Sequence, residues 1–84
     1  YSIYEDKSHR MWIGTKGMGL YMIGNGRFYH FEKNENDIES LASNDIYDIH
    51  EDTRNNIWIA THGQGVQLLV NGGKKNFKFI NIFI

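Results

Sequence analysis

The sequence contains the same pattern twice, at a separation of 46 residues. Residues 1–26 align with residues 47–72 without a gap, and 11 of the 26 aligned positions are identical. The segment MWIGTKGMG (11–19) returns as IWIATHGQG (57–65). Repeats of this length are typical of helical solenoids and of four-stranded propeller blades, so the period restricts the fold to two architectures.

The residue pattern within each repeat favours strands. No stretch places apolar residues at the i, i+3, i+4 and i+7 positions of an amphipathic helix over three turns. The first repeat contains the β-prone runs YSIYE, MWIGT, GLYMIG and RFYHF, and the second contains DIYDIH, IWIAT, GVQLLV and NFKFINIFI. Asn-Gly at 25–26 and at 71–72 predicts tight hairpins, because both turn positions tolerate positive φ. Each repeat is therefore predicted to be a meander of four antiparallel strands.

The repeats define the domain organisation. Residues 1–32 are the first predicted blade and residues 46–84 the second, with an inter-blade connection at 33–45. This connection, KNENDIESLASND, is polar, acidic and long for a simple link. One turn of helix at IESLAS is the alternative for part of it. A propeller needs such a connection, because the outer strand of one blade must return to the inner strand of the next.

The second strand of each repeat indicates how the blades are packed. MWIGT and IWIAT are apolar without alternation, which predicts burial on both faces. A blade stacked between two neighbours has that environment, and repeat proteins usually need about three units for stability. We therefore expect two blades of a larger propeller, or several copies of the chain that close a ring. The apolar end FKFINIFI would be an outer strand, and a hazard for aggregation or oligomerisation where it stays open.

The tryptophans of these strands are candidates for sugar stacking or for the core. Trp12 and Trp58 lie one residue into their apolar runs, and we predict that both are structural side chains packed between blades. Gly14 and Ala60 lie on the same faces as the tryptophans, because side chains alternate along a strand. Small residues there leave room for the next blade, so Ala60→Leu is expected to destabilise the protein.

Composition excludes several functional classes. The chain has no cysteine, so it can form neither a disulfide nor a thiolate metal site. Its net charge is −1, which gives no basis for binding nucleic acid. The four histidines, His9, His30, His50 and His62, do not have the spacing of a metal site. We predict no metal and no cofactor, and no nucleic-acid partner for this segment.

The acidic pairs and the glycines do not predict catalysis. In Glu5-Asp6 and Glu51-Asp52, neighbouring strand residues point to opposite faces, so the two carboxylates cannot act on one bond. Asp6 and Asp52 are instead expected to cap the turns that follow them. KGMGL and HGQGV lack the spacing of phosphate-binding loops and are predicted to be turns. No catalytic residue is predicted, and the chain is not expected to be an enzyme.

The repeated motif resembles that of a known family. The pattern I-x-E-D, a short turn, W-I-G-T and then G-x-G-[LV] is similar to the two-component regulator propeller repeat. IYEDKSHRMWIGTKGMGL and IHEDTRNNIWIATHGQGV carry it, and SLASNDIYDI resembles the family's link between blades. Ala60 departs from the motif, which has glycine there. The motif residues that are interpreted as scaffold are Asp6, Trp12, Thr15, Gly17, Gly19, Asp52, Trp58, Thr61, Gly63 and Gly65.

The resemblance implies a function. It implies a non-catalytic part of the periplasmic sensor region of a bacterial hybrid two-component system, in which propellers precede a membrane span, a histidine kinase and a DNA-binding response regulator. The parent protein would be membrane-anchored and dimeric, and would sense products of polysaccharide breakdown. The expected partners are neighbouring blades or further copies of the chain, and an oligosaccharide. Two alternatives stay open: an enzyme of the streptogramin-lyase type, and a purely structural or protein-binding propeller.

Within the matched turns, four residues differ between the repeats. Lys16 and Met18 in the first repeat correspond to His62 and Gln64 in the second. In a propeller these turns are expected at the same edge as the inter-blade connections, which is the usual ligand surface. We therefore predict that Lys16, Met18, His62 and Gln64 contact the ligand.

Overall fold

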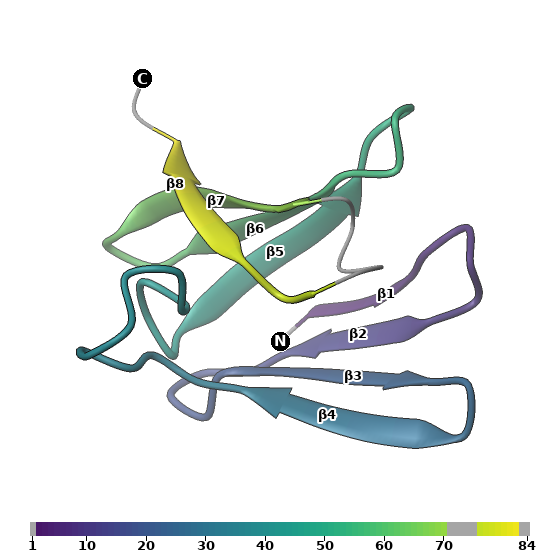
Figure 1. Ribbon diagram of the computed structural model, residues 1–84, viewed down its shortest axis with the longest axis horizontal. Helices are drawn as coiled ribbons and strands as arrows, with labels where there is room; N and C mark the ends of the chain where they lie inside the picture. Colours follow the sequence, from purple (N-terminus) through teal and green to yellow (C-terminus); the bar gives the residue numbers. More distant parts are fainter. Residues whose placement is uncertain (1, 71–75, 83–84) are drawn as a thin grey trace.

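The computed structural model describes residues 2–70 and 76–82, which form two four-stranded sheets (Figure 1). The first sheet, blade 1, consists of β1 (Ser2–Glu5), β2 (Met11–Gly14), β3 (Leu20–Gly24) and β4 (Arg27–Phe31). The second, blade 2, consists of β5 (Ile46–Glu51), β6 (Ile57–Thr61), β7 (Gly65–Leu69) and β8 (Phe79–Ile82). The predicted all-β fold with two antiparallel blades is confirmed.

Both sheets are meanders in which each strand pairs with the next one along the chain. Their registers match across the repeat, since Trp12 pairs with Tyr4 and Trp58 pairs with His50. The β3–β4 hairpin turns at Asn25-Gly26 with φ angles of 53° and 72°, the geometry that the Asn-Gly signal predicts. The second predicted Asn-Gly turn, at 71–72, lies outside the described residues, as do the last two residues of NFKFINIFI.

The inter-blade connection consists of turns and bends without a helix, so the helical alternative for IESLAS is wrong. Its Leu41 is buried in the core. The amide of the buried Gln67 holds the connection on β7, because its Oε1 accepts from the Ala42 N–H at 2.8 Å and its Nε2 donates to the Ser40 carbonyl at 3.1 Å. Packing against blade 2 and these hydrogen bonds therefore replace helical structure.

The blades pack on each other through two different faces. Blade 1 presents the side that carries Trp12, Leu20 and Met22, which we call the tryptophan face. Blade 2 presents the opposite side of the repeat, with Ile57 and Ile59, which we call the isoleucine face. The exposed fraction of each of these five side chains is 3% or less. The core is therefore the contact between one tryptophan face and one isoleucine face.

Aromatic side chains close the outer end of this interface. Phe31 on β4 lies with its ring centroid 4.7 Å from that of Phe77 and 5.6 Å from that of Phe79, both in blade 2. Phe31 also stacks beside Trp12, with the ring centroids 6.3 Å apart. The last strands of the two sheets, β4 and β8, are thus connected through one apolar cluster, which also includes Trp12 on β2.

At the centre of the interface the backbone of β2 lies against β5. A Cβ added to Gly14 would lie 2.5 Å from Cγ2 of Ile46, so the absence of a side chain permits this contact. Ala60, the residue of blade 2 at the same position in the repeat, is on the tryptophan face that this chain leaves uncovered. The close packing expected at Gly14 and Ala60 is therefore found at Gly14.

Each blade is buried on only one of its faces within this chain. On β6, Ile57, Ile59 and Thr61 are buried while Trp58 and Ala60 are half-buried, and on β2 the alternation has the opposite phase. The expectation of burial on both faces is therefore not met by the two blades alone. Among residues 2–70 and 76–82 there is no helix with the length and hydropathy needed to cross a membrane.

Candidate functional site

The glycine turns after β2 and β6 have the same construction. The Thr15 hydroxyl donates to the Gly19 carbonyl at 2.7 Å, and the Thr61 hydroxyl donates to the Gly65 carbonyl at 2.8 Å. In the first turn Gly17 and Gly19 have φ angles of 86° and 84°, a region that L side chains rarely adopt. These motif residues hold the backbone of the turn and leave the intervening side chains exposed.

The end of the connection runs between the two glycine turns. The Asn44 carbonyl accepts hydrogen bonds from the Gly17 and Gly19 N–H groups at 3.1 and 2.8 Å. The next carbonyl, that of Asp45, accepts from the His62 N–H at 3.0 Å. The connection and the glycine turns therefore share one edge of the molecule, at the left of Figure 1, as expected for a propeller.

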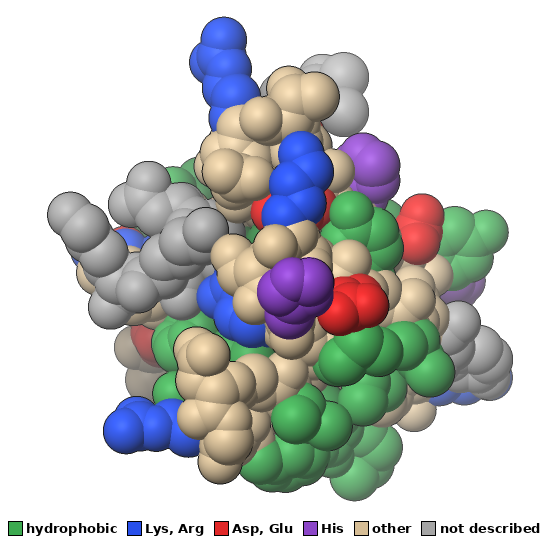
Figure 2. All heavy atoms as spheres, turned by 90° about the vertical axis from the view of Figure 1, so that its right-hand side faces the viewer, with side chains coloured by type: hydrophobic (Ala, Val, Ile, Leu, Met, Phe, Trp, Pro, Cys, Tyr) green, Lys and Arg blue, Asp and Glu red, His purple; other side chains and the backbone are tan. Residues whose placement is uncertain are grey.

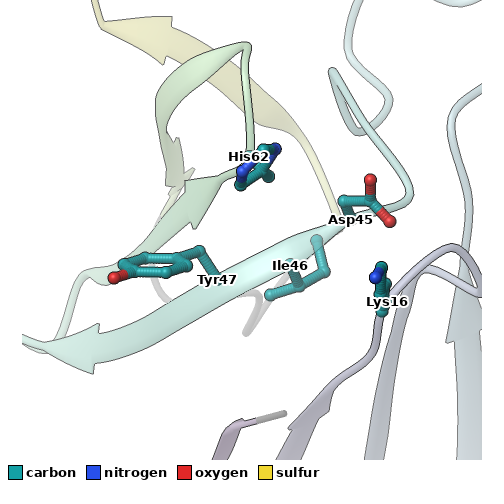
Figure 3. Close-up of a pocket in the computed structure, with 5 residues that line it drawn as sticks. All are labelled: Lys16, Asp45, Ile46, Tyr47 and His62. Carbon is teal, nitrogen blue, oxygen red and sulfur yellow. The ribbon is translucent and has the colours of Figure 1, made fainter.

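A pocket opens at this edge between the blades. It has a volume of about 440 Å³ and is lined by Lys16, Asp45, Ile46, Tyr47 and His62. Lys16 comes from the turn of blade 1 and His62 from the turn of blade 2, while Asp45 ends the connection and Ile46 and Tyr47 begin β5 (Figure 3). This volume falls within the range of about 300–1,000 Å³ that is typical of small-molecule sites.

The structure brings together two of the four predicted ligand residues. Lys16 and His62 line the pocket, whereas Met18 and Gln64 are not among its lining residues. Met18 is 58% exposed, and its carbonyl accepts a hydrogen bond from Nε2 of His30 at 2.7 Å. A contact of any of the four with a ligand stays a prediction, and the geometry favours Lys16 and His62 over Met18 and Gln64.

Three residues of the pocket were missed by sequence reasoning. Asp45, Ile46 and Tyr47 belong to the end of the connection and the start of β5, and the repeat comparison marks only Tyr47, as an identity with Tyr1. The available signal was positional, because the segment that enters the second blade must pass the turn of the first. Tyr47 is 70% exposed although aromatic, which also separates it from the core residues.

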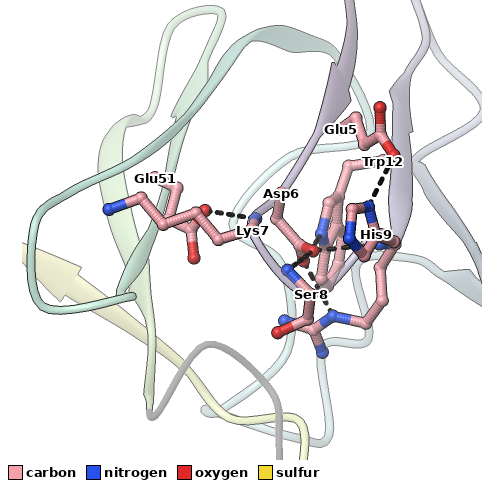
Figure 4. Close-up of polar contacts among 8 residues, drawn as sticks. Glu5, Asp6, Lys7, Ser8, His9, Trp12 and Glu51 are labelled. Carbon is pink, nitrogen blue, oxygen red and sulfur yellow. Dashed lines mark hydrogen bonds and ion pairs between the residues drawn. The ribbon is translucent and has the colours of Figure 1, made fainter.

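The opposite edge of blade 1 is organised around Asp6 (Figure 4). Its Oδ1 accepts from the Ser8 and Arg10 N–H groups, both at 2.9 Å. Its Oδ2 accepts from Nε of Arg10 at 2.7 Å and from Nε1 of Trp12 at 2.8 Å. Burial by itself raises the pKa of Asp6, but the hydrogen bonds and the charge of Arg10 outweigh it, so the pKa lies below its ordinary value.

Asp52 has the same role in blade 2. Its Oδ1 accepts from the Arg54 and Asn56 N–H groups at 2.8 and 3.0 Å, and its Oδ2 accepts from Nε1 of Trp58 at 2.8 Å. The hydrogen bond from Trp58, followed by that from the Asn56 backbone, lowers the pKa of Asp52 from 3.8 to about 2. Both aspartates therefore cap the turn after the first strand and orient the indole of the second.

A further carboxylate connects the two blades at this edge. Glu51 at the end of β5 is only 5% exposed, and its Oε1 accepts from the Lys7 N–H of blade 1 at 2.7 Å (Figure 4). A hydrogen bond to a charged acceptor is stronger than a neutral one, so this contact fixes the β1–β2 turn on the next blade. The Glu-Asp pairs are thus structural: Asp caps its own turn, and Glu51 binds its neighbour.

The described residues contain no cluster of three or more side chains suited to hold a metal ion. The pocket presents an amine, a carboxylate, an imidazole and a phenol ring around an aliphatic wall. Such a set can donate and accept hydrogen bonds and offer an aromatic face, which suits recognition of a polar small molecule.

The two stacked meanders define the class of the molecule, which is that of β-propeller blades. The model of the two component regulator propeller family matches residues 1–17 and 40–63, which contain the first two strands of each blade. The two repeats are therefore two-component regulator propeller repeats, as the resemblance predicted. No curated protein matches the chain.

Proposed function

We propose that this chain is a non-catalytic, ligand-binding part of the sensor propeller of a hybrid two-component system, and that it binds fragments of polysaccharides. The observation that carries the proposal is the pocket between the glycine turns of two family repeats, lined by Lys16, Asp45, Tyr47 and His62. The motif residues around it form the backbone frame, while Lys16 and His62 differ between otherwise matched turns.

The chemistry of the pocket suits a sugar. Tyr47 offers an aromatic face for the C–H groups of a pyranose ring, and its exposure makes that face accessible. Lys16 and His62 can donate hydrogen bonds to hydroxyl oxygens, and the Asp45 carboxylate can accept from hydroxyl groups. Lysine also favours a carboxylate substituent, so an oligosaccharide with a uronic acid is expected to bind more tightly than a neutral one of equal length.

The position of the pocket supplies a mechanism for signalling. Lys16 belongs to blade 1, and His62 and Tyr47 belong to blade 2. A ligand that contacts all three binds best to one arrangement of the blades and therefore stabilises it over others. In the parent protein, a periplasmic, dimeric receptor anchored in the inner membrane, such a shift would pass through the membrane span to the histidine kinase.

Titration of the protein with oligosaccharides tests the proposal. Neutral and uronate-containing oligosaccharides are titrated while the backbone amide signals of Asn44, Asp45 and His62 are followed by NMR. We expect saturable shifts at these amides, and a dissociation constant about threefold to tenfold higher for Lys16→Ala and for Tyr47→Ala, the loss expected for one polar or aromatic contact.

Lys7→Ala is the matched control. Lys7 is exposed and lies at the opposite edge, and its contact with Glu51 uses the backbone N–H, which the substitution keeps. This variant should bind like the original protein. The proposal would be contradicted if no oligosaccharide bound, or if neither Lys16→Ala nor Tyr47→Ala weakened binding. Turnover of an added substrate would indicate an enzyme.

A further inference from the structure

Each blade has a tryptophan face and an isoleucine face, and the interface between the blades buries only one face of each blade. The other face of each blade is uncovered. The covered tryptophan face is in blade 1 and the covered isoleucine face is in blade 2. The tryptophan face of blade 2 and the isoleucine face of blade 1 have no partner blade among the described residues. Because the two blades repeat one sequence, these uncovered faces carry the same positions as the buried interface.

The uncovered tryptophan face matches the buried one position by position. Trp58, Val66 and Leu68 are half-buried, and 46 residues earlier stand Trp12, Leu20 and Met22, which are 0%, 0% and 3% exposed. The change of neighbour, and not a change of residue type, produces this difference. The uncovered face of blade 2 is therefore built like one side of a core.

The uncovered isoleucine face shows the same relation. Ile3 is 69% exposed and Ile23 is 44% exposed, while their counterparts Ile49 and Leu69 are 3% and 0% exposed. Phe28, which pairs with Ile23, is 64% exposed, whereas Phe79, which pairs with Leu69, is 2% exposed. Figure 2 shows hydrophobic side chains gathered in its lower half, at the level of blade 1.

The positions of a polar contact repeat as well. Within the chain, Glu51 of blade 2 accepts from the Lys7 N–H of blade 1 at 2.7 Å. In the other repeat, Glu5 corresponds to Glu51 and Thr53 corresponds to Lys7. The side chain of Glu5 is 55% exposed, and Thr53 is also exposed. Glu5 of one molecule could accept from the Thr53 N–H of another in the same geometry.

We propose that, when these 84 residues stand alone, the uncovered isoleucine face of blade 1 binds the uncovered tryptophan face of blade 2 of a second copy, in the place that a neighbouring blade of the parent propeller would take under the proposed function. The contact is head-to-tail, and the interface inside the chain is its template: Ile3 and Ile23 cover Trp58 and Leu68, and Glu5 hydrogen-bonds to the Thr53 N–H. Such a heterologous contact can repeat until a ring closes. With two blades in each copy, a propeller of about four to eight blades needs about two to four copies.

Variants at the two faces test the proposal in the full chain. Ile3→Asp places a carboxylate on the isoleucine face, and Leu68→Asp places one on the tryptophan face. Burying an unpaired carboxylate is costly, so each variant should raise the dissociation constant by about a hundredfold or more. Ile38→Asp is the matched control, because Ile38 is 95% exposed in the connection, outside both faces. Sedimentation velocity gives the oligomeric state of each protein.

Mixing the two variants identifies the direction of the contact. Ile3→Asp keeps an intact tryptophan face, and Leu68→Asp keeps an intact isoleucine face. Each is expected to be monomeric alone, and the mixture should form a one-to-one dimer that does not grow. A symmetric contact between two identical faces could not produce this result, because one of the two variants would keep that face intact and would still dimerise on its own.

A milder substitution guards against loss of folding. Glu5→Lys leaves the apolar residues unchanged and removes the acceptor for the Thr53 N–H, so it should weaken association measurably while the circular dichroism spectrum stays the same. Three outcomes would overturn the proposal: a monomeric original chain, oligomers that persist in both Ile3→Asp and Leu68→Asp, or a mixture that stays monomeric.

Discussion

Trp12 and Trp58 occupy the same position in two copies of one motif, yet only Trp12 is fully buried. Each indole Nε1 donates to the Oδ2 of an aspartate at 2.8 Å, so the local structure is the same in both blades. Trp12 is 0% exposed because blade 2 covers it, whereas Trp58 is half-buried on an uncovered face. The comparison separates what the motif builds locally from what only a neighbouring blade supplies.

The two caps also differ in one partner. Asp6 is paired with the buried Arg10, whose guanidinium carbon also lies 5.1 Å from the centroid of the Trp12 ring. At the same position as Arg10, blade 2 has Asn56, which donates to Asp52 at 3.3 Å. The cap of blade 1 therefore includes a charge pair and a cation–π contact. In the cap of blade 2, the side chain at the same position donates a hydrogen bond to the carboxylate but carries no charge.

Replacing the two tryptophans in turn should give the largest difference. Trp12→Ala is expected to lower the free energy of unfolding by about 3–5 kcal/mol, the usual cost of removing a buried aromatic side chain. This loss approaches the whole stability of so small a chain. Trp58→Ala should cost less than half as much, measured by urea unfolding in dilute solution. Equal losses would mean that the packing of blade 2 on Trp12 adds nothing to the stability.

Removing the two capping carboxylates should give the next largest difference. Asp6→Ala removes the carboxylate that pairs with the buried Arg10, and breaking such a buried pair is expected to cost about 3 kcal/mol or more. Asp52→Ala should be milder, because no buried guanidinium depends on it. Adding Arg10→Met to Asp6→Ala should recover part of the loss in urea unfolding. No recovery would contradict the role assigned to the pair.

The small residues beside the tryptophans provide a third comparison. Gly14→Ala places a methyl group against Ile46 and is expected to cost about 1–3 kcal/mol. Ala60→Leu adds more volume but on the uncovered face. In place of the destabilisation expected from the sequence, it should therefore change the melting temperature little in dilute solution, while weakening any association through that face. A larger loss for Ala60→Leu than for Gly14→Ala in the monomer would reverse this assignment.

The smallest expected effect is a loss of stability at acid pH, when the capping carboxylates of Asp6 and Asp52 become protonated. The pKa of Asp52 is lowered from 3.8 to about 2 in the folded protein, and that of Asp6 is lowered as well. Between these values the unfolded chain binds more protons than the folded chain, so the free energy of unfolding falls as the pH falls from about 4 to about 2. Asp52→Asn should flatten part of this slope in urea titrations; an unchanged slope would assign the acid sensitivity to other groups.

Much of the fold could be predicted because the signals are local and occur twice. The Asn25-Gly26 hairpin, the glycine turns closed by Thr15 and Thr61, and the Asp-capped turns depend on residues within six positions of each other. Sequence could not reveal that the connection packs through Leu41 and Gln67, because those contacts join residues 25 or more positions apart. A mostly polar segment in which only one large apolar residue, Leu41, is buried is compatible with a helix or with turns until its neighbours are known.

Part of the candidate site could be predicted because its turns occur twice in the sequence. Lys16 and His62 stand out because they differ between matched turns, and the shared edge of the turns follows from the blade topology. Asp45 and Tyr47 complete the pocket only because the connection passes between the two turns, with Asn44 bonded to one and Asp45 to the other. That crossing follows from the order of the blades along the chain and not from the residue types of the segment itself.

The sequence by itself determined the repeat, the order of the strands, the turns and the residues that hold them, since hydrogen bonds between near neighbours decide these features. Only the tertiary structure decided which face of each blade is buried. Burial of apolar area depends on what lies opposite, and two strands with nearly the same residues, β2 and β6, therefore bury opposite faces in this chain. The same physical reason leaves one tryptophan in the core and its repeat at the surface.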